Sequence, residues 1–152
     1  MKKKSYKKTD LNFFTLLLSV IVLDQVAKYL VKSNFLPNSS MNITSFFSLT
    51  FTQNTGVSFG LLKGYNSVFV VLSFIALGFF SYIYIKNKKY WTQLSLICAG
   101  IAGNLIDRLN FGYVIDLFDF HIWPVFNIAD SAICVGIIWL IILAAKNNDE
   151  LI

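Results

Sequence analysis

Three carboxylates stand out because they lie in the apolar stretch 112–130, which reads GYVIDLFDFHIWPVFNIAD. They are Asp116, Asp119 and Asp130, and long hydrophobic runs flank the stretch on both sides. Burying a carboxylate costs free energy, so an acid kept in such surroundings usually has a partner or a function. Two neighbouring aspartates share a proton, and the pair can act as base and acid in one reaction. We interpret Asp116 and Asp130 as such a pair at a membrane surface.

The spacing of these two acids limits how they could meet. In one continuous helix, a separation of fourteen positions would hold them about 21 Å apart, so the chain must turn back. Pro124 is a suitable break, because proline lacks an amide donor and disfavours helix in the residue before it. A structural alternative remains: Asp116 and Asp119 are exposed loop acids, and Asp130 lies in the first turn of a helix that Asn127 caps.

Few other side chains could build a reactive or metal-binding site. His121 is the only histidine, and Cys98 and Cys134 each lie inside a hydrophobic run without a second ligand at metal-binding spacing. We therefore expect no metal and no cofactor. Both cysteines are interpreted as apolar packing residues, and His121 as an interfacial loop residue.

The composition is typical of a membrane protein. Hydrophobic residues make up 56% of the chain and charged residues 14%, and the apolar residues are grouped in runs. We expect an all-α integral membrane protein of one domain, residues 1–152, with four transmembrane helices at about 11–31, 66–85, 91–109 and 127–145. The first run is interpreted as an uncleaved helix, since no small-residue cleavage pattern follows it.

Residues 32–64 have a different pattern. Hydrophobic and polar residues largely alternate over 43–52, which favours a strand, and Asn54, Thr55 and Gly56 follow as a turn. We expect a small β-sheet between the first and second spans, lying on the membrane surface.

The basic residues predict the orientation of the chain. The lysines of the first eight residues, of the 86–89 loop and of the carboxyl end would all lie on one side. By the positive-inside rule both termini are cytoplasmic, and the sheet, the polar cluster 104–108 and the acid pair face the extracytoplasmic side. The basic amino terminus therefore indicates orientation among membrane lipids, and we expect no nucleic-acid partner.

Asp24 and Lys28 lie four residues apart in the first span, with the acid first, which favours a pair on one helix face. We interpret them as a self-neutralising pair, with the Lys28 side chain extending to the interface.

Five sequence blocks carry a resemblance to a known family. They are DQVAK at 24–28, NTGVSFGLL at 54–62, AGIAGNLIDRL at 99–109, and GYVIDLFDF and FNIAD within 112–130. The chain resembles the lipoprotein signal peptidases, the type II signal peptidases of bacteria, over nearly its whole length. The resemblance implies a metal-free aspartyl endopeptidase of the bacterial inner membrane, which removes the signal peptide from prolipoproteins before a diacylglyceryl-modified cysteine. We expect it to act as a monomer.

The resemblance also implies roles for individual residues. Asp116 and Asp130 would be the catalytic pair that activates a water, and Asp119 would be structural or interfacial. Val57, Ser58 and Ala99 depart from the common family pattern in ways that leave the pair unaffected. The residues implied to bind substrate or support the site are Asp24, Lys28, Asn54, Gly56, Gly60, Gly103, Asn104, Asp107, Arg108, Asn127 and Ala129.

Three other functions are compatible with parts of the sequence. A small proton-coupled transporter could use the membrane acids as a relay, although these acids lie toward the outer ends of their spans. A non-catalytic assembly factor could keep them for packing. A Ser–Lys protease would need Ser58 and Lys28, but Lys28 already has Asp24 beside it.

Overall fold

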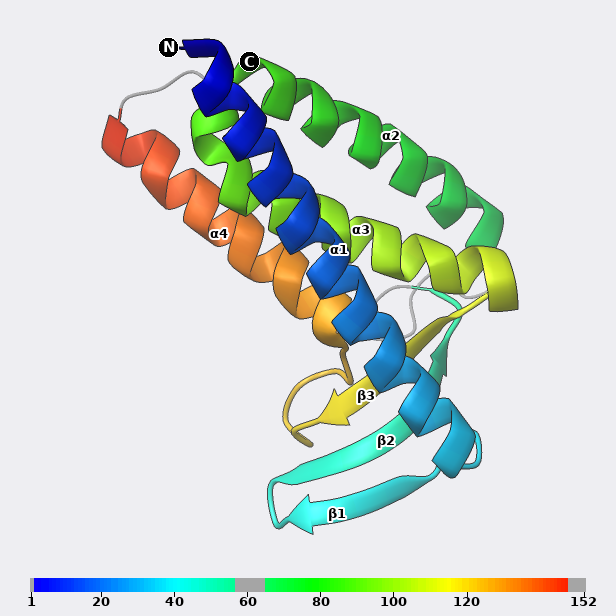
Figure 1. Ribbon diagram of the computed structural model, residues 1–152. Coiled ribbons are helices and arrows are strands. Elements are labelled where there is room, and N and C mark those ends of the chain that lie inside the picture. Colours follow the sequence, from blue (N-terminus) through cyan, green and yellow to red (C-terminus); the bar gives the residue numbers. More distant parts are fainter. Residues whose placement is uncertain (1, 57–64, 148–152) are drawn as a thin grey trace.

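The computed structural model describes residues 2–56 and 65–147, with side chains from residue 7 onward. Within these residues the chain forms long helices at one end and a small sheet at the other (Figure 1). The α-helices are α1 (Lys2–Asn34), α2 (Asn66–Lys86), α3 (Trp91–Phe111) and α4 (Ile128–Asn147), and a 3-10 helix, η2 (Lys88–Tyr90), precedes α3. The strands are β1 (Ser40–Thr44), β2 (Phe47–Asn54) and β3 (Val114–Asp119).

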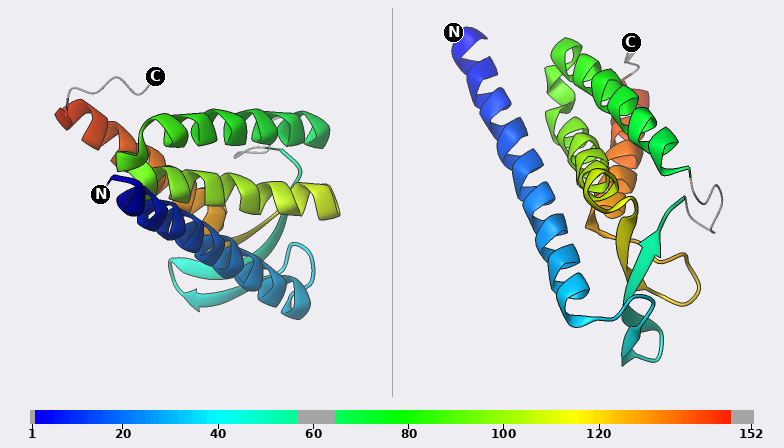
Figure 2. Two further views of the ribbon diagram at one scale, coloured as in Figure 1. Left: turned by 45° about the horizontal axis from the view of Figure 1, so that its top comes forward. Right: turned by 90° about the vertical axis from the view of Figure 1, so that its right-hand side faces the viewer.

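Helix α3 is the centre of the bundle and packs against α1, α2 and α4 (Figure 2). Small residues allow α3 and α4 to approach closely, because a methyl group on Gly100 would lie 2.3 Å from the Ala129 carbonyl oxygen. Three helical segments are long and apolar enough to cross a membrane: Lys7–Asn34, Asn66–Lys86 and Ile128–Asn147. Helix α3 is less apolar but is the most enclosed, and its buried face includes Asn104 and Asp107.

The outer surface of the bundle is apolar. Large exposed hydrophobic side chains cover α1, α2 and α4, among them Leu18, Val22, Leu72, Ile75 and Ile141. A helix satisfies its own backbone hydrogen bonds, so such a surface is suited to lipid rather than water. The predicted helical membrane class, with a small sheet, is therefore confirmed.

The sheet differs from the sequence prediction in two ways. The alternating run 43–52 is not one strand, because a turn at Ser45 and Phe46 divides it between β1 and β2. The sheet also has a third strand, β3, which comes from between α3 and α4 and pairs antiparallel with β2. The expectation of a sheet built from residues 32–64 alone was thus incomplete. The segment 112–119 contains too few polar residues to alternate, so its strand character was hidden.

Two local features connect the bundle to the sheet. Helix α3 ends at Phe111 and is capped by Gly112, whose left-handed φ of 79° turns the chain into β3. The sheet then packs on the end of α1 through a cluster of buried residues, Val31, Phe51, Ile115 and Leu117. The bundle and the sheet therefore meet where β3 begins.

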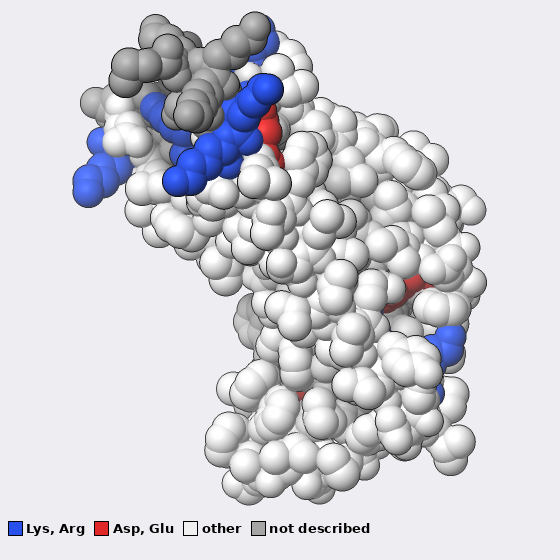
Figure 3. All heavy atoms as spheres, in the orientation of Figure 1, with Lys and Arg blue, Asp and Glu red and all other residues white. Residues whose placement is uncertain are grey.

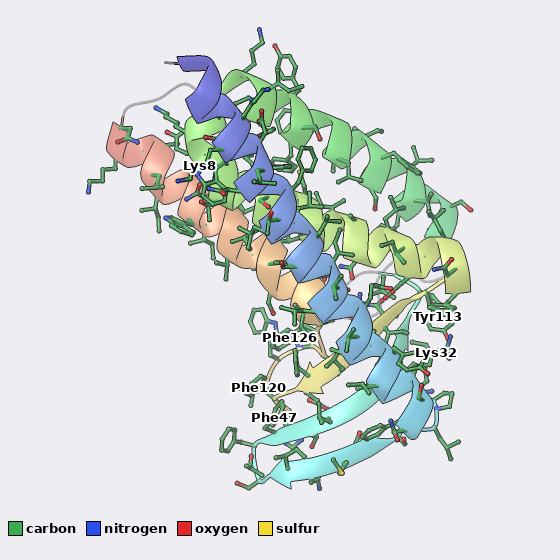
Figure 4. The ribbon with its side chains drawn as sticks, viewed as in Figure 1. Lys8, Lys32, Phe47, Tyr113, Phe120 and Phe126 are labelled. Atoms are coloured by element: carbon green, nitrogen blue, oxygen red, sulfur yellow. The ribbon has the colours of Figure 1, made fainter. Side chains whose placement is uncertain are left out.

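The 120–127 segment returns the chain from β3 to α4. Phe126 pairs with Phe118 by backbone hydrogen bonds, and its ring stacks on that of Phe120, which contacts Phe47 of β2 (Figure 4). This return, in which Pro124 lies, brings the start of α4 back beside β3. The required turn between Asp116 and Asp130 is present.

Candidate active site

Asp116 lies at the middle of β3, opposite Thr52 of β2, and is 2% exposed. Its carboxylate accepts two hydrogen bonds, from Asn54 Nδ2 at 2.9 Å and from Asn127 Nδ2 at 2.7 Å. Burial, with the nearby charge of Asp130 as the second cause, raises the pKa of Asp116 to about 7. The interpretation of Asp116 as an exposed loop acid was therefore wrong, because the residue is in a buried strand.

Asp130 lies in the first turn of α4 and is partly exposed. Asn104 Nδ2 donates to its Oδ1 atom at 2.7 Å, and the Asn127 backbone N–H donates to its Oδ2 atom at 3.3 Å. Asn127 therefore contacts both aspartates, one through its side chain and one through its backbone. The acids, fourteen residues apart in sequence, meet around this one asparagine.

A buried ionic cluster lies beside the two aspartates. Lys28 is 1% exposed and pairs with Asp24 and Asp107, each at 2.8 Å, and it donates to Asn104 Oδ1 at 3.0 Å. The prediction that Lys28 extends to the interface was wrong. Two carboxylates from different helices compensate its charge inside the bundle, which an isolated pair on α1 could not do.

Most of the remaining predicted residues lie around this cluster. Ala129 donates its backbone N–H to Asp24 Oδ1 at 2.9 Å, and Gly103 leaves room for the same carboxylate. Arg108 points toward the Gly56 carbonyl oxygen, 3.5 Å away, and lies over the Phe69 ring. Gly60, Val57 and Ser58 lie outside the described residues.

Two contributors were not predicted. Gln25 Nε2 contacts Asp24, the Gly103 carbonyl oxygen and Asp107, so it joins α1 to α3 within the cluster. The backbone N–H of Ile115 donates to Asp107 Oδ2 at 3.1 Å. Gln25 could have been found from its place between Asp24 and Lys28, whereas a backbone contact leaves no signal in side-chain types.

Two apolar cavities open near the acids, and Asp130 lines one of them. One, of about 460 Å³, is lined by Asp130 together with Trp123, Pro124, Phe126, Ser131, Ile133, Cys134 and Val135. The other, of about 250 Å³, lies between α2, α3 and α4 and is lined by Phe69, Leu72, Ser73, Ala76, Ile101, Asn104, Arg108 and Ile133. An acid in contact with both water and apolar surfaces could react with an amphipathic substrate.

Of the other titratable candidates, only Cys134 lies near this arrangement, because it lines the larger cavity together with Asp130. His121 Nε2 is 2.9 Å from Ser48 Oγ, and its backbone N–H donates to Asp119, at the far end of β3. Cys98 is buried in the helix bundle and Cys134 is exposed on α4. In residues 2–56 and 65–147, no group of three or more His, Cys, Asp or Glu residues is arranged to hold a metal ion.

Fold and site together define a helical membrane protein with a cluster of buried acids at one end of the bundle, the arrangement of a membrane enzyme. A bacterial membrane enzyme of known structure superposes on 91% of this chain and 90% of its own, with a TM-score of 0.84 and 32% identity. A second superposes on 89% of this chain and 93% of its own, with a TM-score of 0.81 and 32% identity.

Sequence relatives identify the family. The family model described as signal peptidase (SPase) II matches residues 16–146. The lipoprotein signal peptidase of Thermodesulfovibrio yellowstonii is 41% identical over 143 residues, covering 91% of this chain and 94% of the relative. That of Moorella thermoacetica is 43% identical over 141 residues, covering 88% and 94%. The chain belongs to the signal peptidase II family and is a peptidase of a bacterial membrane.

Proposed function

We propose that the chain is an aspartic endopeptidase that removes signal peptides from prolipoproteins, with Asp116 and Asp130 as its catalytic residues. Its relatives are named lipoprotein signal peptidases, and the family resemblance specifies cleavage just before a diacylglyceryl-modified cysteine. The observation that carries the catalytic assignment is the meeting of the two acids around Asn127.

The chemistry needs one proton shared between the two acids. The ionised carboxylate takes a proton from a water molecule while the water oxygen attacks the peptide carbonyl carbon. The protonated acid donates its proton to the carbonyl oxygen. The tetrahedral intermediate then collapses: the acid that took the water proton passes it to the leaving nitrogen, and the other carboxylate takes back a proton from a hydroxyl of the intermediate, which restores the pair. A pKa of about 7 for Asp116 supports a pair that keeps this proton near neutral pH.

The apolar cavities beside Asp130 support a lipid-bearing substrate. Their walls are suited to the acyl chains and the hydrophobic segment of a membrane-anchored precursor, and Asp130 lines the larger of the two. Because both acids come from one chain, a monomer suffices for the reaction.

The orientation follows from the charge distribution. Lysine side chains gather at the end of the bundle where α1 begins and α4 ends (Figure 3), and the loop there carries Lys86, Lys88 and Lys89. By the positive-inside rule this end is cytoplasmic, in the inner membrane, and the acids and the sheet are extracytoplasmic.

The assignment is tested with purified protein in detergent and a lipidated precursor peptide. Asp116→Asn and Asp130→Asn should each lower kcat by about 10²–10⁴-fold, because each removes a proton-transfer group. Asp119→Asn is the matched control: it makes the same chemical change in the same strand, where the side chain only accepts a bond from His121. Full activity in either of the first two variants would remove that residue from the catalytic pair.

A further inference from the structure

The ammonium group of Lys28 makes three contacts, one for each of its hydrogens. Its Nζ atom lies 2.8 Å from Asp24 Oδ2, 2.8 Å from Asp107 Oδ2 and 3.0 Å from Asn104 Oδ1. A lysine ammonium has three donors and no acceptor, so these three oxygens use its full capacity. The side chain is buried at the α1–α3 contact, away from solvent.

Both carboxylates that contact Lys28 also hold a backbone N–H group next to a catalytic aspartate. Asp24 Oδ1 accepts the N–H of Ala129, the residue before Asp130, at 2.9 Å. Asp107 Oδ2 accepts the N–H of Ile115, the residue before Asp116, at 3.1 Å. The two chain segments that carry the pair are therefore attached to two acids that share one cation.

The third contact sets the orientation of an amide. Asn104 Oδ1 accepts from Lys28 and from Asn127 Nδ2 at 3.2 Å, so its Nδ2 group is the atom that faces Asp130, at 2.7 Å. Rotating this amide by half a turn would bring an NH₂ group toward the ammonium and an oxygen toward the carboxylate, which is unfavourable on both sides.

We propose that Lys28 is a positioning residue that fixes the separation of Asp116 and Asp130. It does so by joining Asp24 to Asp107 and by orienting Asn104. Without the cation, the two like-charged carboxylates would repel each other inside the bundle, and the N–H groups that they hold would follow them. This inference rests on the proposed function, since the separation matters only if both acids act on one water.

The position of Lys28 predicts how the kinetics should change. It lines neither cavity beside Asp130. Instead it lines a separate cavity of about 450 Å³ with Gln25, Tyr29, Lys32, Ser33, Asp107, Phe111 and Ile115. A residue that does not meet the substrate should leave KM unchanged, whereas misplacing a catalytic group by about 1 Å costs about 10²-fold in rate.

The test compares three variants of the full chain in detergent with a lipidated precursor peptide. Lys28→Met removes the cation but leaves two buried carboxylates unpaired, so its melting temperature should fall. The charge-neutral combination Lys28→Met, Asp24→Asn, Asp107→Asn leaves no buried charge unpaired in the cluster. Lys32→Met is the matched control, one helical turn further along α1 (Figure 4). The Lys32 ammonium lies over the Phe111 ring.

We expect the charge-neutral combination to fold, with kcat per folded molecule about 100-fold below the parent and KM within about threefold of it. Lys32→Met should match the parent in both constants. Folded protein is counted by its melting transition and its monodisperse elution, so a loss of folded material is not mistaken for a loss of rate.

Three results would overturn the inference. One is a charge-neutral combination with kcat close to the parent, which would show that the bridge is dispensable. Another is a raised KM with kcat retained, which would make Lys28 a substrate-binding residue. The third is a combination without a melting transition, which would make Lys28 a requirement of the fold. Asp116→Asn, run in parallel, separates these from a failure of the proposed function, because an active Asp116→Asn would reject the acid pair itself.

Discussion

Asn127 and Asp130 cap each other's backbone at the start of α4. The Asp130 N–H donates to Asn127 Oδ1 at 2.8 Å, and the Asn127 N–H donates to Asp130 Oδ2 at 3.3 Å, a reciprocal arrangement that satisfies two free helix donors. The Nδ2 group of the same asparagine donates to Asp116 Oδ1. Asp130 can therefore lie in the capped first turn of α4 and also belong to the acid pair, because Asn127 both caps the helix and joins the two acids.

Replacing Asn127 by serine should separate these two roles. Serine is a good N-cap, so Asn127→Ser should keep the helix start. Its side chain is too short to reach Asp116 while capping, so the acid loses one of its two hydrogen bonds. We expect a melting temperature below that of the parent, because the buried Nδ2 group also donates to Asn104 Oδ1 and to the Ile115 carbonyl oxygen. We expect kcat to be lowered by about 10–100-fold, measured on the precursor peptide.

The matched variant is Asn127→Ala, which removes the cap as well. It should be less stable than Asn127→Ser by about 0.5–2 kcal/mol and no more active. If the serine variant were fully active, the bond from Asn127 to Asp116 would have no part in the reaction.

The pKa of Asp116 predicts a fall in activity at alkaline pH. Burial and the charge of Asp130 raise this pKa to about 7, so the acid keeps its proton below that pH and loses it above. Because the reaction needs one proton in the pair, kcat should fall about tenfold per pH unit above the apparent pKa of the pair. A rate that rises steadily from pH 7 to 9 would contradict the shared proton.

The same shift has a consequence for stability. An unfolded aspartate titrates near 3.9, so between roughly pH 4 and 7 the folded chain binds the proton that the unfolded chain has released. The contribution of Asp116 to the free energy of unfolding is therefore fully present at low pH, and it is lost as pH rises through this window. Thermal melts from pH 5 to 8 should show a downward slope that is weaker in Asp116→Asn.

The close contact of α3 and α4 predicts that an alanine at Gly100, where the two helices touch, lowers both stability and activity. A methyl group on Gly100 would lie 2.3 Å from the Ala129 carbonyl oxygen, so Gly100→Ala must push α4 away. We expect a loss of about 1–3 kcal/mol in stability. Activity should also fall, because Ala129 precedes Asp130 and is held by Asp24.

Two other glycines are controls for this prediction. Gly136→Ala makes the same kind of clash farther along α4, against Ile97 and the Gln93 carbonyl oxygen, so it should lower stability with less effect on kcat per folded molecule. Gly78→Ala meets no atom within 4 Å and should be neutral or stabilising. Equal losses of kcat in Gly100→Ala and Gly136→Ala would argue against a direct effect of Gly100→Ala on the site.

The sequence predicts the parts of this molecule that depend on periodicity and charge. The apolar runs identify the helical segments, and the family motifs point to Asp116, Asp130 and their asparagine neighbours. The requirement that the chain turn back between the acids follows from helix geometry alone. These inferences succeed because they depend on residues close together in sequence or on short motifs that a family resemblance identifies.

The missed features depend on contacts between distant segments. Strand β3 is buried on both faces, so it lacks the alternation that reveals a half-buried strand. The burial of Lys28 requires Asp107, which lies 79 residues away and belongs to another helix. Seen with Asp24 alone, Lys28 has only one compensating charge, and extension to the interface is then the reasonable expectation.

The proposed orientation predicts which positions a membrane-impermeant maleimide can reach. With Cys98 and Cys134 replaced by alanine, a single cysteine is introduced either as Ser45→Cys, in the turn between β1 and β2, or as Asn147→Cys, at the end of α4. Lys8 and Lys32 mark the two ends of α1, and the sheet lies at the Lys32 end (Figure 4). The positive-inside rule assigns the Lys8 end to the cytoplasm.

In intact spheroplasts Ser45→Cys should react and Asn147→Cys should not, whereas both should react after permeabilisation. The reverse pattern would put the acid pair on the cytoplasmic side, where an exported precursor would no longer meet it.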